Sequence, residues 1–122
     1  MFSATILDHF EKPRNARELP PPAVMVEATN PVCGDILRLW LLVEAGMIRD
    51  AGFKAKGCVA AIASGSVLTE MVKGKTVELA SRLSADELAA ALGGLPPESS
   101  HAADLAVETL RSALRKAPVM PR

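Results

Sequence analysis

The chain has 122 residues, enough for one domain that buries roughly two thirds of the surface its unfolded chain exposes. Its 14 basic and 14 acidic residues give a formal net charge of zero, which argues against nucleic acid as a partner. The longest apolar runs, residues 39–43 and 58–63, are too short to span a membrane, and no export signal opens the chain. We therefore expect a single domain over residues 1–122, with a flexible tail from about 117, in a soluble, cytoplasmic protein without a membrane partner.

The first half of the chain predicts one helix and three strands. Apolar residues at helical spacing follow Ser3, a good N-cap, and Pro13 ends the pattern, so a short helix is expected. The middle strand is almost continuously apolar around Trp40, which indicates burial on both faces or a second face that meets a partner. In the last strand apolar residues alternate with lysines, which indicates one buried face and one in water. The expected ranges are 3–10 for the helix and 24–28, 36–43 and 47–56 for the strands.

The second half predicts four helices. Cys58 opens the first of them and Gly74 closes it, while Thr76 and Ser84 are the N-caps of two short ones. The last helix begins near His101 and carries its apolar and charged residues on opposite faces. The expected ranges are 58–73, 77–81, 85–92 and from about 101 onward.

Small residues fill the first half of the helix that begins at Cys58. Residues 60–66 are mostly Ala, Ser and Gly, too small for an ordinary apolar stripe. Such a run indicates that another backbone or a bound cluster lies very close, and a tightly packed helix without a ligand explains it equally well.

Four residues are candidate metal ligands: Cys33, Asp35, Cys58 and His101. Gly34 allows a tight turn between the Cys33 thiol and the Asp35 carboxylate. We expect both cysteines to be free thiols, and the unpaired N–H groups at a helix N-terminus to favour the thiolate of Cys58. Two thiolates, an imidazole and a carboxylate suit zinc, or iron with bridging sulfide.

Each candidate has a simpler interpretation. Cys58 could be a small buried apolar residue, and His101 could be a surface or capping residue. The spacing contains no Cys-x-x-Cys pair, so the sequence alone does not bring the four side chains together. We interpret the other histidine, His9, as structural.

Three segments, in this order, resemble the IscU/NifU family of iron–sulfur cluster assembly scaffolds. They are residues 3–15 (SATILDHFEKPRN), 30–35 (NPVCGD) and 57–66 (GCVAAIASGS), and the resemblance runs nearly to Lys116. It implies an α+β fold in which a small three-stranded antiparallel sheet packs against several helices, the SufE/NifU-like α/β sandwich.

The resemblance also implies a function and its residues. Such a protein is a scaffold or carrier, not an enzyme, and holds a nascent [2Fe–2S] cluster or iron between a cysteine desulfurase and cluster-accepting apoproteins. Cys33 and Cys58 are then cluster ligands, and Asp35 keeps the cluster labile. We expect His101 to bind as well, with Asp35 as the fourth or exchangeable ligand.

The chain departs from the family at the start of its last helix. The family has a lysine, an apolar residue, a histidine and a third cysteine there, and this chain has Ser99-Ser100-His101-Ala102. The family's third cysteine is a cluster ligand and an acceptor of persulfide sulfur, roles that Ala102 cannot fill. The preceding Leu-Pro-Pro continues with Glu98 and Ser99 where the family has Val-Lys, so recognition by a dedicated chaperone is not expected.

Two alternatives to a working scaffold stay open. One is a degenerate relative that has lost cluster assembly and docks on a desulfurase. The other is a small zinc protein in which the same four residues form a closed tetrahedral site.

Overall fold

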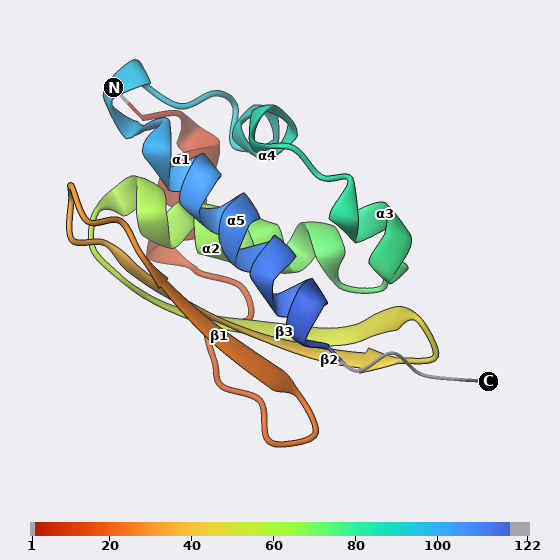
Figure 1. Ribbon diagram of the computed structural model, residues 1–122. Coiled ribbons are helices and arrows are strands. Elements are labelled where there is room, and N and C mark those ends of the chain that lie inside the picture. Colours follow the sequence, from red (N-terminus) through yellow and green to blue (C-terminus); the bar gives the residue numbers. More distant parts are fainter. Residues whose placement is uncertain (1, 118–122) are drawn as a thin grey trace.

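The computed structural model describes residues 2–117 and is shown in Figure 1. The expected helices and strands are all present, with ends within a few residues of the predicted ones. Their bounds are α1 Ala4–Glu11, β1 Val24–Thr29, β2 Ile36–Glu44, β3 Met47–Lys56, α2 Val59–Val72, α3 Val77–Ser81, α4 Ala85–Ala91, the short 3₁₀ helix η1 Pro97–Ser99, and α5 His101–Lys116. The tail expected from about 117 falls mainly on residues 118–122, which lie outside the described residues.

The three strands form one antiparallel sheet in the order β1-β2-β3, so the predicted α+β fold is confirmed. A two-residue turn joins β2 to β3, and both of its residues, Ala45 and Gly46, have positive φ, at 52° and 76°. Positive φ at both positions is the geometry that matches the twist of a tight hairpin. Within residues 2–117 no helix combines the length and the apolar character that crossing a bilayer requires.

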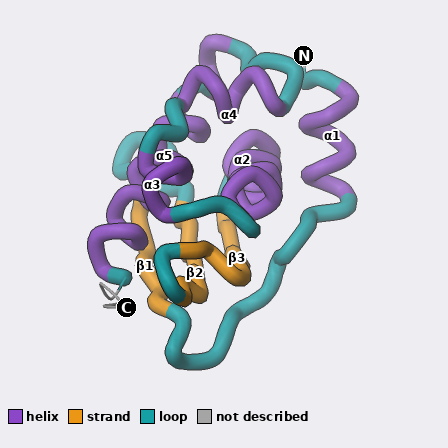
Figure 2. The backbone as a smooth tube through the Cα atoms, turned by 90° about the vertical axis from the view of Figure 1, so that its right-hand side faces the viewer, coloured by secondary structure: helices purple, strands orange, loops and turns teal. Residues whose placement is uncertain are grey.

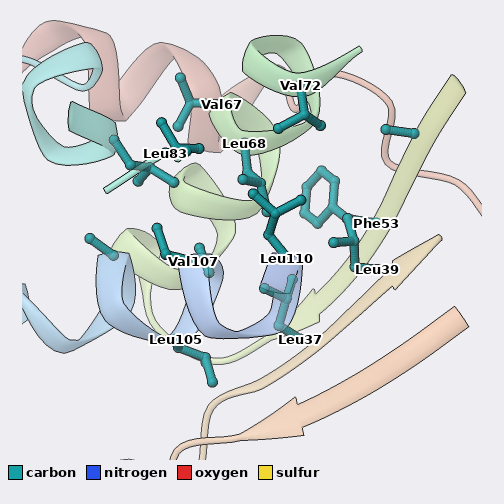
Figure 3. Packing of buried hydrophobic residues seen from close by; sticks show 14 of the residues in the cluster. Leu37, Leu39, Phe53, Val67, Leu68, Val72, Leu83, Leu105, Val107 and Leu110 are labelled. Atoms are coloured by element: carbon teal, nitrogen blue, oxygen red, sulfur yellow. The ribbon is translucent and has the colours of Figure 1, made fainter. Parts of the chain in front are cut away.

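Helices α2 and α5 cover one face of this sheet, and Figure 2 shows them above the strands. Leu37, Leu39 and Phe53 point from β2 and β3 toward Leu68 of α2 and Leu110 of α5, and all five are buried (Figure 3).

The small residues of α2 allow it to approach the sheet closely. A Cβ added to Gly65 would lie 2.6 Å from Cδ2 of Phe53, closer than real carbon atoms approach one another. Close packing against the sheet therefore accounts for Gly65 without any ligand.

The opposite face of the sheet is only partly covered. Trp40 on β2 is 7% exposed, and Leu19, from the segment between α1 and β1, lies over Gly52, the β3 partner of Trp40. Arg38, two residues before Trp40, is exposed. The first of the two predicted alternatives, burial on both faces, is therefore right for Trp40 and wrong for Arg38, because the covering segment crosses only part of the sheet. The second, that this face meets a partner, stays a prediction.

Helix α1 is fixed to α2 by buried polar contacts. Nδ1 of His9 lies 2.7 Å from Oγ of Ser66, and the backbone N–H of Arg14 donates to the same oxygen at 2.8 Å. Burial, together with the charge of Arg14, lowers the pKa of His9, while Glu70 and Asp8 oppose the effect. His9 is thus a structural residue, as predicted.

Candidate metal centre

The loop between β1 and β2 presents Cys33 at the surface. The N–H of Asn30 donates to the Asp35 carbonyl at 2.8 Å, and the N–H of Gly34 donates to the Asn30 carbonyl at 2.7 Å. Gly34 has φ 75°, a conformation that glycine adopts without steric cost. The side-chain oxygen of Asn30 also accepts from the N–H of Val32 at 2.9 Å. These bonds close the loop, so Cys33 is exposed while Asp35, at its end, is buried.

Asp35 joins this loop to the start of α2. The residue is 2% exposed, and its Oδ1 accepts from the backbone N–H of Cys58 at 3.2 Å. Its Oδ2 accepts from the thiol of Cys58 at 3.5 Å. The carboxylate therefore binds the N–H of the N-cap residue of α2, the bond that a Glu side chain makes in a capping box, although it comes from a residue distant in sequence.

Gly57 makes room for this carboxylate, a role that the sequence analysis missed. It has φ 147°, and a Cβ built on it would overlap Oδ1 of Asp35. The signal in the sequence was the glycine immediately before Cys58, at the start of the segment 57–66.

His101 approaches the same carboxylate from the first turn of α5. Its Nε2 lies 3.4 Å from Oδ2 of Asp35 and makes no hydrogen bond within residues 2–117. The side chain is 30% exposed, and a cavity of about 200 Å³ beside it is also lined by Asn30, Asp104 and Glu108. The imidazole is therefore partly exposed, while its Nε2 atom, which faces Asp35, is buried.

All four candidates meet in one place. Donor atoms of Cys33, Asp35 and His101 lie within 4.8 Å of one another, and Cys58 joins them through its contact with Asp35. Metal bonds of about 2.0–2.3 Å place the donors of a tetrahedral ion roughly 3.3–3.8 Å apart. Cys33, Asp35 and His101 therefore form a compact group that could hold one small ion, and the Cys58 thiol stands beside this group.

The expectation that the helix N-terminus favours the thiolate of Cys58 is wrong. The residue is exposed overall, but its thiol packs against Asp35, and this partial burial raises the pKa of Cys58 above its ordinary value. The negative charge of Asp35 raises it further, and the N–H groups of Ala61 and Ala60 lower it only in part. Burial of the thiol, with the carboxylate beside it adding to the effect, therefore outweighs the N–H groups of the helix start.

Ala102 follows His101 and is 1% exposed. Its methyl group cannot bind a metal, and it belongs to the buried side of α5 with Leu105 and Ala106. The centre therefore has two thiols.

The fold and the donor set define a small α+β protein with two thiols, a carboxylate and an imidazole at one surface. A family model described as the NifU-like N terminal domain matches residues 1–119, and the chain belongs to this family. The resemblance inferred from the three sequence motifs is thereby confirmed.

Several relatives share most of their length with this chain. The iron–sulfur cluster assembly scaffold protein IscU of Azotobacter vinelandii is 42% identical over 118 residues, which are 93% of this chain and 91% of that protein. IscU 1 of Archaeoglobus fulgidus, with the same description, is 42% identical over 114 residues, covering 93% and 74%. A crystal structure of a SUF-system scaffold protein from Fervidobacterium islandicum has the same fold, with TM-score 0.70, 23% identity and coverage of 93% and 96%.

Proposed function

We propose that this protein is an iron–sulfur cluster assembly scaffold that binds iron or a [2Fe–2S] cluster transiently and passes it to acceptor proteins. Cys33, Cys58 and His101 bind the metal, and Asp35 is the fourth or exchangeable ligand. The observation that carries the proposal is the meeting of these four side chains from three separate parts of the chain. Relatives about 40% identical that are named as scaffolds support it.

The chemistry of the centre suits a carrier better than a catalyst. Thiolates bind iron and bridging sulfide tightly, whereas a carboxylate and an imidazole are harder ligands, so a mixed site gives up its cargo more readily. The partners that follow are a cysteine desulfurase as sulfur donor and apoproteins as recipients, met in the cytoplasm.

Anaerobic reconstitution tests the proposal. The apo protein is supplied with iron and sulfide, and visible charge-transfer absorption is recorded together with iron and acid-labile sulfide content. We expect a cluster in the wild type and its loss in Cys33→Ser and Cys58→Ser proteins whose circular dichroism is unchanged. A wild type that takes up no sulfide contradicts the proposal; if it still binds a desulfurase, a degenerate docking role is favoured instead.

The compactness of the donor set favours one other function, a structural zinc site. Donor atoms of Cys33, Asp35 and His101 lie within 4.8 Å of one another and the Cys58 thiol lies 3.5 Å from Asp35, and these donor types suit tetrahedral zinc. Protein purified without added metal is analysed for zinc, treated with a chelator and followed by circular dichroism. Unfolding on zinc removal supports the structural site, and an unchanged fold contradicts it.

A further inference from the structure

A cavity of about 360 Å³ lies away from the candidate metal centre, between the last turn of α2 and the helices α3 and α4 (Figure 1). This volume is in the range of small-molecule sites. None of its lining residues belongs to the metal centre, and the proposed function does not use it. The lining is mainly apolar, with Met71, Val72, Leu79, Ala80 and Leu83.

Hydrogen bonds to the β2–β3 hairpin hold the walls of this cavity in place. The N–H of Val77, the first residue of α3, donates to the Gly46 carbonyl at 2.9 Å. The N–H of Gly74, just after α2, donates to the Ile48 carbonyl at 2.8 Å. The cavity is therefore formed before any ligand arrives, so binding requires little ordering of the chain.

The apolar lining has a buried part and an exposed part. Val72 and Ala80 are 1% and 4% exposed, whereas Leu79 on α3 is 56% exposed. Leu79 thus presents a large apolar side chain to water beside a mainly apolar cavity. Covering this surface with an alkyl chain is favourable, and each methylene group that is fully buried strengthens binding roughly fourfold.

The charged residues that line the cavity favour an anion. Lys75, which follows α2, is exposed and forms no ion pair within residues 2–117. Arg82 is the second cation and pairs with Glu78 at 2.9 Å, a contact between two exposed side chains that solvent weakens. The carboxylate of Glu87 also lines the cavity, but its Oε1 accepts from the N–H of Ser84 at 2.9 Å in the cap of α4. Lys75 is therefore available to a negatively charged ligand.

We propose that this cavity binds a small amphiphilic carboxylate, with its alkyl chain over Leu79 and Leu83 and its carboxylate toward Lys75. The ligand is a free acid with a single chain of medium length, such as octanoate. This site goes beyond the proposed function, because binding requires neither iron nor a thiol.

Nuclear magnetic resonance titration of the metal-free, isotope-labelled full chain with hexanoate, octanoate and decanoate tests the site, each acid below its micelle-forming concentration. We expect saturable shifts at Met71, Leu79 and Leu83, and an affinity that rises roughly two- to fourfold with each methylene group. Octylammonium, which has the same chain as octanoate and the opposite charge, is expected to bind more weakly. Shifts that do not saturate, or that have no maximum at the cavity, overturn the site. Equal affinity for octanoate and octylammonium overturns the assignment of a carboxylate.

Two pairs of variants, each checked for folding by circular dichroism, separate the role of the alkyl chain from that of the charge. Leu79→Asp should weaken octanoate binding at least about tenfold, and Leu7→Asp, at an exposed leucine of α1 outside the cavity, should not. Lys75→Glu should invert the preference between octanoate and octylammonium, and Lys54→Glu, at an exposed lysine of β3, should not. Octanoate binding that Leu79→Asp leaves unchanged, or a preference that Lys75→Glu leaves intact, contradicts the proposal.

Discussion

Asp35 holds Cys58 through both of its carboxylate oxygens: Oδ1 accepts from the backbone N–H at 3.2 Å and Oδ2 accepts from the thiol at 3.5 Å. This arrangement fixes the thiol that we propose as a ligand before any metal arrives. Burial of that thiol, together with the negative charge beside it, also disfavours its ionisation and so raises its pKa.

Replacing the carboxylate is expected to make Cys58 more reactive in the apo protein. Burial and the charge of Asp35 raise the pKa of the thiol, so Asp35→Asn should lower that pKa and increase the thiolate fraction near neutral pH. We expect faster alkylation of Cys58 by iodoacetamide, measured by peptide mass mapping between pH 7 and 9. Asp104→Asn, an exposed carboxylate on α5, is the control and should leave the rate unchanged. An unchanged rate in Asp35→Asn would show that burial alone governs the thiol, and a slower rate would contradict the effect assigned to the carboxylate.

Asp35 packs directly against Gly57, so one methyl group added at Gly57 is expected to lower the free energy of unfolding markedly. Gly57→Ala should displace the carboxylate, because the new Cβ overlaps Oδ1, and should destabilise the fold by roughly 1–3 kcal/mol. Gly46→Ala is the matched control: its φ is also positive, but no atom lies within 4 Å of the added Cβ, so a cost of about 1 kcal/mol is expected. Urea unfolding measures the free energy of unfolding of both variants. Equal costs in the two variants would mean that Asp35 moves aside freely.

Removal of the Asp35 side chain is expected to prolong the life of a bound cluster. Oδ2 lies 3.5 Å from the sulfur of Cys58, close enough to compete with that thiolate for iron. The Asp35→Ala protein should therefore lose its cluster to a chelator severalfold more slowly than the wild type, followed by the decay of visible absorption. Faster loss would assign the carboxylate a protective role.

Mild acidification is expected to lower the stability of the fold because it protonates His9. Burial lowers the pKa of His9 below its ordinary value of 6.5, so the folded state binds this proton less readily than the unfolded state. The contribution of neutral His9 to the free energy of unfolding is complete above pH 6.5 and is lost as the pH falls through the pKa of His9 in the folded state. We expect urea midpoints to decrease over that interval, and His9→Gln, though less stable, to have a flatter profile. Identical pH profiles in the two proteins would exclude His9 as the cause.

Much of the fold could be predicted from local patterns in the sequence. The N-caps Ser3, Thr76 and Ser84 mark helix starts because each side chain accepts from a backbone N–H three residues later. The short helix η1 was not predicted, because prolines and a short polar run carry no periodic signal. The partial cover over β2 was not predicted either, since the path of the segment around Leu19 depends on contacts with β3.

The identity of the four donors could be inferred from residue types, but their meeting could not. A sequence records chemical groups and local spacing, and it therefore identified Cys33, Asp35, Cys58 and His101 as candidates and Ala102 as a position without a thiol. Tertiary structure alone decided that the β1–β2 loop and the starts of α2 and α5 meet. It also reversed the expected pKa shift of Cys58, because burial of the thiol and the charge that folding brings beside it outweigh the N–H groups of the helix start.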